Sequence, residues 1–385
     1  MTGAAYLSDA DCDIAAFTAL IDRRLDAAEV PLAAEIVHNV PVYDCAALAP
    51  RLGDPADRRR LMAEWAAGLM QGAGVLVLRG ASPKTAPIDA ATDIYTAIIA
   101  EEKGRAAGDH FAAGGANDRV WNSLQKLCLR APEVFAAYFG NPVIAAVCEA
   151  WLGAGYQMTA QVNLVRPGGK AQTAHRDYHL GFQTAEAARA YPAHVHDLSA
   201  VLTLQGAIAH CDMPVESGPT KLLPFSQMFR PGYLAYRLPA FAALFEARCI
   251  QLPLAKGDAL FFNPALFHAA GENRSADIQR MANLLQVSSP FGRAMEAVDR
   301  DAMCRALYPV LRAMPDAQMA PAARQAAIAA CAEGYAFPTN LDTDPPIGGL
   351  APESQAALFA RALAEGMTPG AFAAALDAHG ARRHA

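Results

Sequence analysis

Hydrophobic and polar residues follow two different patterns along the chain. From Asp9 to about Met70, and again over 81–157, apolar residues recur at helical spacing with breaks at proline. Between about 156 and 290 the spacing changes to short alternating runs separated by Gly and Pro, such as "YQMTAQVNLV", "SAVLTLQGAIA" and "RMANLLQVS". After about 295 the helical spacing returns. The pattern predicts a β core between two helical regions.

Two local signals refine this picture. The run "GVLVLRG" (Gly74 to Gly80) predicts a short buried strand, and "NPVIAAVCEAWLG" predicts a helix with Asn141 as its N-cap and Gly153 as its stop. The expected fold class is α+β with a mainly β core, an antiparallel sandwich or barrel. We expect three regions packed as one compact unit: helical residues 1–155, the β core 156–292 and a helical extension 293–385.

Composition and charge exclude some partners. Hydrophobic residues make up 53% of the 385 residues, and the net charge is -6 without any basic block, so we expect no nucleic-acid partner. Asp9, Asp11 and Asp13 stand where a secretory signal needs positive charge, and no apolar run is long enough to span a bilayer. We therefore expect a cytoplasmic chain without a membrane partner, whose eight cysteines are reduced thiols.

The stretch "TAHRDYHLGF" (173–182) carries the first candidate chemistry. In a strand, residues i and i+2 share a face, so His175, Asp177 and His179 would point the same way and Arg176 the other way. A second polar cluster, "GDALFFNPALFHAAGENRSADIQR", places His268 at the end of one expected strand and Arg280 at the start of the next.

These groups suit one kind of metal site. Two imidazoles and one carboxylate occupy one face of an octahedral Fe(II) and leave three positions open. His175, Asp177 and a distant histidine form such a set. An arginine twelve positions after His268 is suited to a bidentate pair with the far carboxylate of a dicarboxylic acid, which indicates Arg280.

Taken in order, "HRD" at 175–177, "ESGPTKLLPFSQ" at 216–227 and the cluster ending at Arg280 resemble the phytanoyl-CoA dioxygenase-like branch of the Fe(II)/2-oxoglutarate oxygenases. The segment "FGNPVIAAVCEAWLG" is similar to the helix that precedes the core in that family. The resemblance covers about 160 to 290. The chain departs from it at Ser217, Gln227 and Ala270.

The resemblance implies a double-stranded β-helix (jelly-roll) core. It also implies that His175, Asp177 and His268 bind Fe(II), and that Arg280 holds the co-substrate 2-oxoglutarate. Two further residues that share a face of the preceding strand would hydrogen-bond the same co-substrate, namely Gln161 and Asn163. The expected activity is a dioxygenase that uses O2 to hydroxylate a C–H bond of a small-molecule substrate.

Three further residues are candidate substrate contacts. His179 shares the predicted inward face with the metal ligands and is expected to contact them or the substrate. Tyr178 contacts the substrate or packs in the core. Gln205, a polar residue on one side of an apolar strand, lines the cavity or lies at an exposed edge.

Other interpretations of the same residues stay open. A second His-x-Asp at 210–212 is interpreted as a connecting loop with solvated polar residues. His194 and His196 suggest a zinc hydrolase, although a solvated loop is the simpler interpretation. Arg274 competes with Arg280 for the carboxylate.

Two alternatives concern the protein as a whole. A non-catalytic jelly-roll binding protein would have no reason to keep the two imidazoles, the carboxylate and the arginine together. A related halogenase would need a small residue in place of the carboxylate, so Asp177 argues against it.

Overall fold

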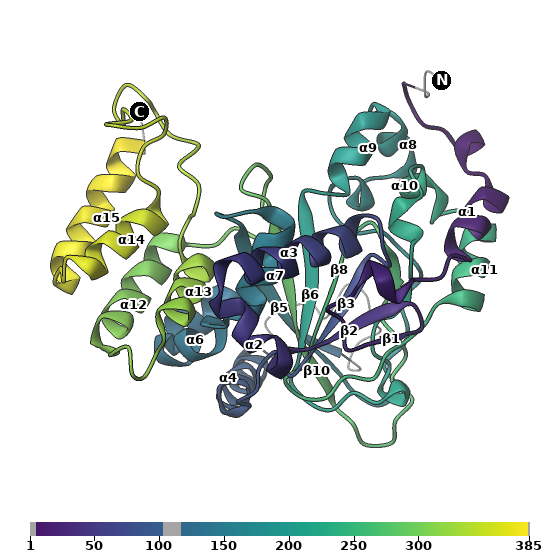
Figure 1. Ribbon diagram of the computed structural model, residues 1–385, viewed down its shortest axis with the longest axis horizontal. Helices are drawn as coiled ribbons and strands as arrows, with labels where there is room; N and C mark the ends of the chain where they lie inside the picture. The colour runs from purple at the N-terminus through teal and green to yellow at the C-terminus, as the bar shows by residue number, and fades with distance from the viewer. Residues whose placement is uncertain (1–4, 103–116, 384–385) are drawn as a thin grey trace.

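A mostly antiparallel eight-stranded sheet forms the middle of the molecule (Figure 1). The computed structural model describes residues 5–102 and 117–383, so part of the predicted helical stretch 81–157 lies outside the described residues. The strand order is β1-β2-β3-β8-β6-β10-β5-β4, and only β2 and β3 pair in parallel. A second sheet consists of β7 and β9. The strands are β1 (Glu35–Val37), β2 (Val40–Asp44), β3 (Val75–Arg79), β4 (Asn117–Val120), β5 (Gln157–Val165), β6 (Thr203–Ala209), β7 (Lys221–Leu223), β8 (Ala259–Phe262), β9 (Phe267–Ala269) and β10 (Arg280–Ser288).

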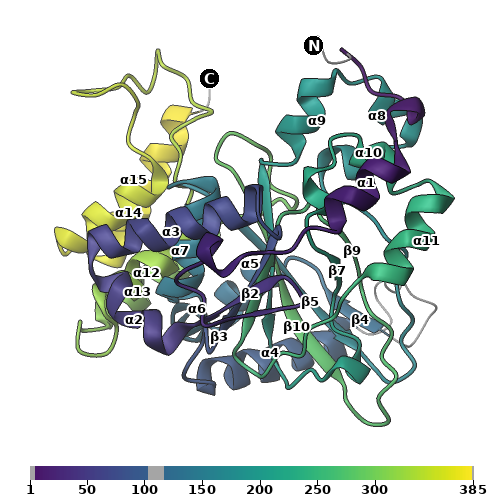
Figure 2. The same cartoon turned by 45° about the vertical axis from the view of Figure 1, so that its right-hand side comes forward.

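Two groups of helices lie at opposite ends of the sheet (Figures 1 and 2). The C-terminal helices α12 to α15 lie together at one end, and α1 with α8 to α11 lie at the other. The helices are α1 (Ile14–Ile21), α2 (Cys45–Gly53), α3 (Pro55–Met70), α4 (Ala86–Glu102), α5 (Ser123–Arg130), α6 (Pro132–Phe139), α7 (Pro142–Leu152), α8 (Ala185–Arg189), α9 (Ala193–Ser199), α10 (Gly232–Ala235), α11 (Pro239–Arg248), α12 (Arg300–Ala313), α13 (Pro321–Cys331), α14 (Gln355–Ala364) and α15 (Pro369–Arg383).

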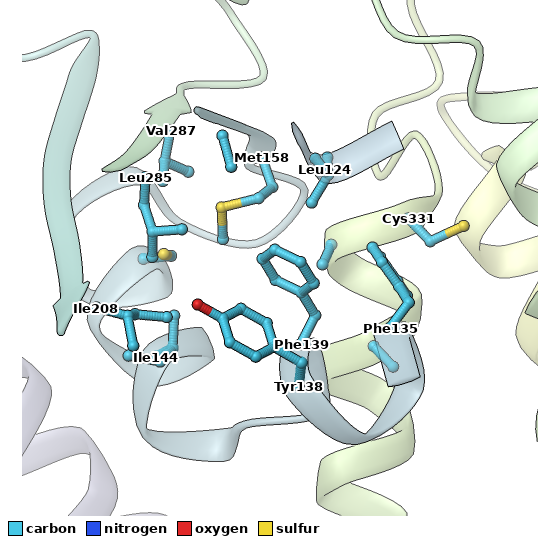
Figure 3. Packing of buried hydrophobic residues seen from close by; sticks show 14 of the residues in the cluster. Leu124, Phe135, Tyr138, Phe139, Ile144, Met158, Ile208, Leu285, Val287 and Cys331 are labelled. Atoms are coloured by element: carbon cyan, nitrogen blue, oxygen red, sulfur yellow. The ribbon is translucent and has the colours of Figure 1, made fainter. Parts of the chain in front are cut away.

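Alternation along β10 separates the hydrophobic core from a cavity. Met281, Leu285 and Val287 point toward the helices and belong to the largest buried cluster. Figure 3 shows Leu285 and Val287 with the rings of α6, including Tyr138. Arg280 and every second residue up to Gln286 face the cavity instead. Because successive side chains of a strand point to opposite faces, one strand supplies both the core and the site.

The predicted helical character of residues 1–155 is wrong in part. The described residues of this region contain α1 to α7, but also β1 to β4, which lengthen the main sheet at both edges. The apolar, β-branched runs Val40–Asp44 and Val75–Arg79 are suited to pairing in a sheet. The strand predicted over Gly74 to Gly80 is confirmed as β3. The division into three regions stays a prediction.

The helix predicted after Asn141 is confirmed as α7. The Asn141 Oδ1 atom accepts hydrogen bonds from the backbone N–H groups of Val143 and Ile144, as an N-cap does. Among residues 5–102 and 117–383, no single helix is long and apolar enough to cross a membrane. The helices α6 and α7 together reach the length and composition, but they meet at 65° and bury many of their side chains in the core.

Candidate metal centre

Three side chains that are distant in the sequence converge on one point. One ligand atom from each of His175, Asp177 and His268 lies within 4.8 Å of the others. The His175 Nε2 atom is 3.6 Å from Asp177 Oδ1, and the His268 Nε2 atom is 3.4 Å from Asp177 Oδ2. Within the described part of the chain, this is the one group of three or more His, Cys, Asp or Glu side chains close enough to hold a metal ion.

Backbone pairing brings these residues together. The N–H group of His175 donates to the His268 carbonyl oxygen at 3.0 Å, and the His268 N–H donates back to the His175 carbonyl oxygen at 3.2 Å. The Asp177 N–H donates to the Pro264 carbonyl oxygen at 3.1 Å. Residues 175 to 177 therefore run beside β9, which explains why the i and i+2 side chains meet the distal histidine.

Hydrogen bonds fix which nitrogen each imidazole presents. The Nδ1 atoms of His175 and His268 each lie 2.8 Å from a carbonyl oxygen, of Thr173 and Leu266 respectively. A carbonyl oxygen only accepts, so each Nδ1 carries the proton and each Nε2 presents a lone pair. Burial, and then the neighbouring His268, lower the pKa of His175, which keeps that ring neutral.

The carboxylate of Asp177 is held ionised and oriented. Burial by itself would raise the pKa of Asp177, but the neighbouring His268 and His175 and the hydrogen bond from Gln205 hold it well below its usual range. Gln205 Nε2 donates to Asp177 Oδ2 at 2.5 Å. Two neutral imidazole nitrogens and one carboxylate oxygen are a donor set that fits Fe(II). The residues present therefore fit the metal.

A cavity of about 840 Å³ lies beside this centre. Its wall includes these three side chains, the predicted co-substrate residues Gln161, Asn163 and Arg280, and the predicted substrate contact Gln205. Arg280 is buried and keeps one long hydrogen bond of 3.5 Å, from Nη1 to the Gly271 carbonyl oxygen. Its rival Arg274 is exposed at the surface. Of these two arginines, Arg280 is the one that lines the cavity.

The prediction of a continuous strand through His179 is wrong. His175 forms a single β-bridge, and after Asp177 the backbone turns, with φ of 64° at Tyr178 and 44° at His179. This left-handed conformation leads into a short 3-10 helix, His179–Phe182, so His179 does not share a face with the ligands. Neither Tyr178 nor His179 is among the described residues that line the cavity.

The second His-x-Asp follows β6 in a loop, and Asp212 is exposed as predicted, but His210 is buried and not solvated. His210 Nδ1 lies 2.8 Å from Thr92 Oγ1, and His210 Nε2 lies 2.7 Å from the Tyr138 hydroxyl oxygen. Both nitrogens are thus engaged on the helix side of the sheet. Burial lowers the pKa of His210 to about 3. This histidine is a neutral core residue whose two ring nitrogens form hydrogen bonds with hydroxyl groups.

The predicted solvated loop around His194 and His196 is the helix α9 instead. His194 is exposed, whereas His196 is buried with its Nε2 atom 3.0 Å from the Ala188 carbonyl oxygen. Two residues two positions apart on a helix point to different sides, so these imidazoles do not converge. Among the residues that the structure describes, no cluster of three His, Cys, Asp or Glu side chains that could hold a metal ion includes His194 or His196.

Arg176, between the two ligands, is the residue that sequence reasoning missed. As predicted, its side chain points away from His175 and Asp177, but the residue is buried, with 2% exposure, and its guanidinium group donates to the backbone carbonyl oxygens of Ser226 and Phe229. Because these acceptors are backbone atoms about fifty positions downstream, no residue pattern could have marked them.

Comparison with known proteins gives a family and several distant structures. No curated protein sequence matches the chain. Among solved structures, the epimerase SnoN, in complex with Fe3+, alpha ketoglutarate and nogalamycin RO, has 20% identity and a TM-score of 0.41, over 62% of this chain and 85% of that chain. The carbocyclase SnoK from nogalamycin biosynthesis has 18% identity and a TM-score of 0.42, over 58% of this chain and 83% of that one. AviO1 from Streptomyces viridochromogenes Tue57 has 16% identity and a TM-score of 0.38, over 54% and 87%. Likenesses this low carry no argument about the reaction.

The family match is broader. Residues 70–282, more than half of the chain, match the family described as Phytanoyl-CoA dioxygenase (PhyH). The matched range contains the three converging ligands and Arg280. The chain therefore belongs to the phytanoyl-CoA dioxygenase family, whose metal is iron and whose co-substrate is 2-oxoglutarate.

Proposed function

We propose that the protein hydroxylates a C–H bond of a small-molecule substrate, as a dioxygenase that depends on Fe(II) and 2-oxoglutarate. The observation that carries the proposal is the convergence of His175, Asp177 and His268 beside an 840 Å³ cavity that also contains Arg280. When bound, iron and 2-oxoglutarate supply the oxidation of the substrate by O2, with succinate and CO2 as co-products.

The residues of the chain have distinct tasks in this proposal. The two imidazoles and the Asp177 carboxylate hold the metal from one side and leave its other positions open toward the cavity. Gln205 keeps the carboxylate turned toward the metal through the hydrogen bond to Oδ2. Arg280 binds the far carboxylate of 2-oxoglutarate, and the amides of Gln161 and Asn163 hydrogen-bond the same molecule.

We further propose that the two sheets form a double-stranded β-helix. The β7-β9 sheet is extended by single bridges on both sides, since His175 pairs with His268 and Leu222 pairs with Ile250. Residues of this smaller sheet, such as Leu222, and residues of the large sheet, such as Leu260, line the same cavity. The metal ligands would then lie at the open end between two facing sheets.

The cavity wall favours a substrate without positive charge. Asp177 is the one carboxylate among the described residues of the wall, and in this proposal it is committed to the metal. A cationic substrate would lose its hydration there without gaining an anionic partner. Neutral or anionic molecules are therefore the class to test first.

The test compares the two His-x-Asp sequences. Iron content and 2-oxoglutarate consumption are measured for wild type, His175→Ala and His210→Ala, each purified without oxygen. The His175 variant should lose both bound iron and 2-oxoglutarate consumption. The His210 variant should keep iron in the part of the protein that folds. Loss of iron from the His210 variant, with iron retained in the His175 variant, would place the metal on the helix side of the sheet and contradict the proposal. Once a substrate is found, labelled O2 should place one oxygen atom in the product.

A further inference from the structure

Arg176 connects the residues that flank all three metal ligands. It follows His175 and precedes Asp177, and its Nη2 atom donates to the carbonyl oxygens of Ser226 at 2.7 Å and Phe229 at 2.9 Å, with a longer contact of 3.3 Å to Gln227. The turn 226–229 in turn touches β9, since Ser226 Oγ accepts a hydrogen bond from the Phe267 N–H at 2.8 Å.

Aromatic rings complete the enclosure of the guanidinium group. The Arg176 Cζ atom lies 5.3 Å from the ring centre of Phe267, the residue before His268, and 5.1 Å from the ring centre of Tyr233. A cation over the face of an aromatic ring is attracted to it, more strongly when water is excluded. The same side chain thus contacts the segment of the first two ligands and the neighbour of the third.

Gly232 shows how tightly this enclosure fits. A Cβ atom built on Gly232 would lie 2.0 Å from Arg176 Cζ, so no larger residue fits there while the guanidinium keeps its position. The hydrogen-bond acceptors of Arg176 are backbone carbonyl oxygens, and no carboxylate among the described residues forms an ion pair with it. Burying a cation without an ionic partner costs desolvation free energy. The presence of Arg176 at this place therefore calls for a reason other than stability.

We propose that Arg176 is a positioning residue that holds His175, Asp177 and His268 at the spacing required for metal binding. The inference rests on the proposed function, because it assumes that these three side chains bind the metal. A planar guanidinium group reaches several carbonyl oxygens and two rings at once, whereas a lysine ammonium group cannot do both. Losing this group should let the 175–177 segment and β9 shift relative to each other.

The experiment is a titration of the full chain with Co(II), which reports both affinity and coordination geometry through its visible absorption. Arg176→Met should bind Co(II) roughly 10- to 100-fold more weakly, as expected when a group that orients metal ligands is lost. The absorption spectrum of the bound ion should also change. Arg176→Lys, which keeps the charge, should recover part of the affinity.

A matched control separates positioning from general stability. Arg300 is another largely buried arginine that donates to backbone carbonyl oxygens, those of Met158, Ala330 and Cys331, on the helix side of the sheet. Arg300→Met should lower the resistance to urea but leave the Co(II) affinity and spectrum of the folded protein unchanged.

Gly232→Ala tests the same idea without touching the arginine. It should weaken Co(II) binding in the wild type but add little in the Arg176→Met background, whereas Gly68→Ala, where a new Cβ has open space, should change nothing. Wild-type affinity and spectrum in both Arg176→Met and Gly232→Ala, or an equal loss in Arg300→Met, would overturn the role of Arg176. Wild-type protein that binds no Co(II) would instead overturn the metal assignment, and this role with it.

Discussion

Replacing Arg280 with methionine should stabilise the protein while weakening its affinity for 2-oxoglutarate. Arg280 is 7% exposed, and its one hydrogen bond in the structure is the 3.5 Å contact with the Gly271 carbonyl oxygen. Burial lowers the pKa of Arg280 to about 10, so the group keeps its charge at neutral pH although its surroundings disfavour that charge. A side chain in this state is prepared for an anionic partner.

The size of both effects follows from this environment. The difference between the ordinary pKa of 12.5 and a value of about 10 corresponds to roughly 3 kcal/mol of unfavourable burial of the charge. Methionine keeps an unbranched apolar side chain and has no charge, so Arg280→Met should raise the free energy of unfolding of the ligand-free protein by about 1 to 3 kcal/mol. Loss of a charge-assisted pair should lower the affinity for 2-oxoglutarate roughly 10- to 100-fold.

Urea unfolding without ligand and calorimetric titration with 2-oxoglutarate measure the two quantities. Arg274→Met is the control, since Arg274 is exposed and should change neither. Titration with 2-oxovalerate, which lacks the second carboxylate, adds a further check: wild type should prefer 2-oxoglutarate, and Arg280→Met should lose that preference. An Arg280→Met protein that is less stable and still binds 2-oxoglutarate with wild-type affinity would refute the reasoning.

Three more predictions concern the neighbouring groups. Because the pKa of His210 is lowered to about 3, the unfolded chain takes up a proton below pH 6.5 that the folded chain does not. The free energy of unfolding should therefore fall by about 1.4 kcal/mol per pH unit between 6.5 and 3 from this group alone, and urea titrations of His210→Asn should show a flatter dependence. Gln205→Met removes the donor to Asp177 and should weaken Co(II) binding several-fold in a titration; unchanged binding would show that this hydrogen bond does not orient the carboxylate. Asp177→Gly should lose iron-dependent 2-oxoglutarate consumption, and a full rate in that variant would mean that Asp177 is not a ligand.

Local sequence determined the chemistry of the site. The spacing of His175 and Asp177 is enough to put both side chains on one side of an extended segment, and the structure keeps residues 175 to 177 extended beside β9. The alternation in β10 likewise follows from strand geometry, which brings Arg280 and Gln286 to the cavity side. Both inferences needed only the two-residue alternation of side chains along an extended segment, which is a property of local backbone geometry.

Tertiary structure decided the features that depend on contacts between residues far apart in the sequence. The turn after Asp177 depends on left-handed backbone at Tyr178 and His179, a conformation that no residue pattern there requires. His210 becomes a core residue because Thr92 and Tyr138 come from helices far away in the sequence. The enclosure of Arg176 consists of backbone carbonyl oxygens, which every residue carries, and of the rings of Tyr233 and Phe267, which come from distant segments. Such contacts form only when distant segments pack, so their positions are a property of the folded chain and not of its local pattern.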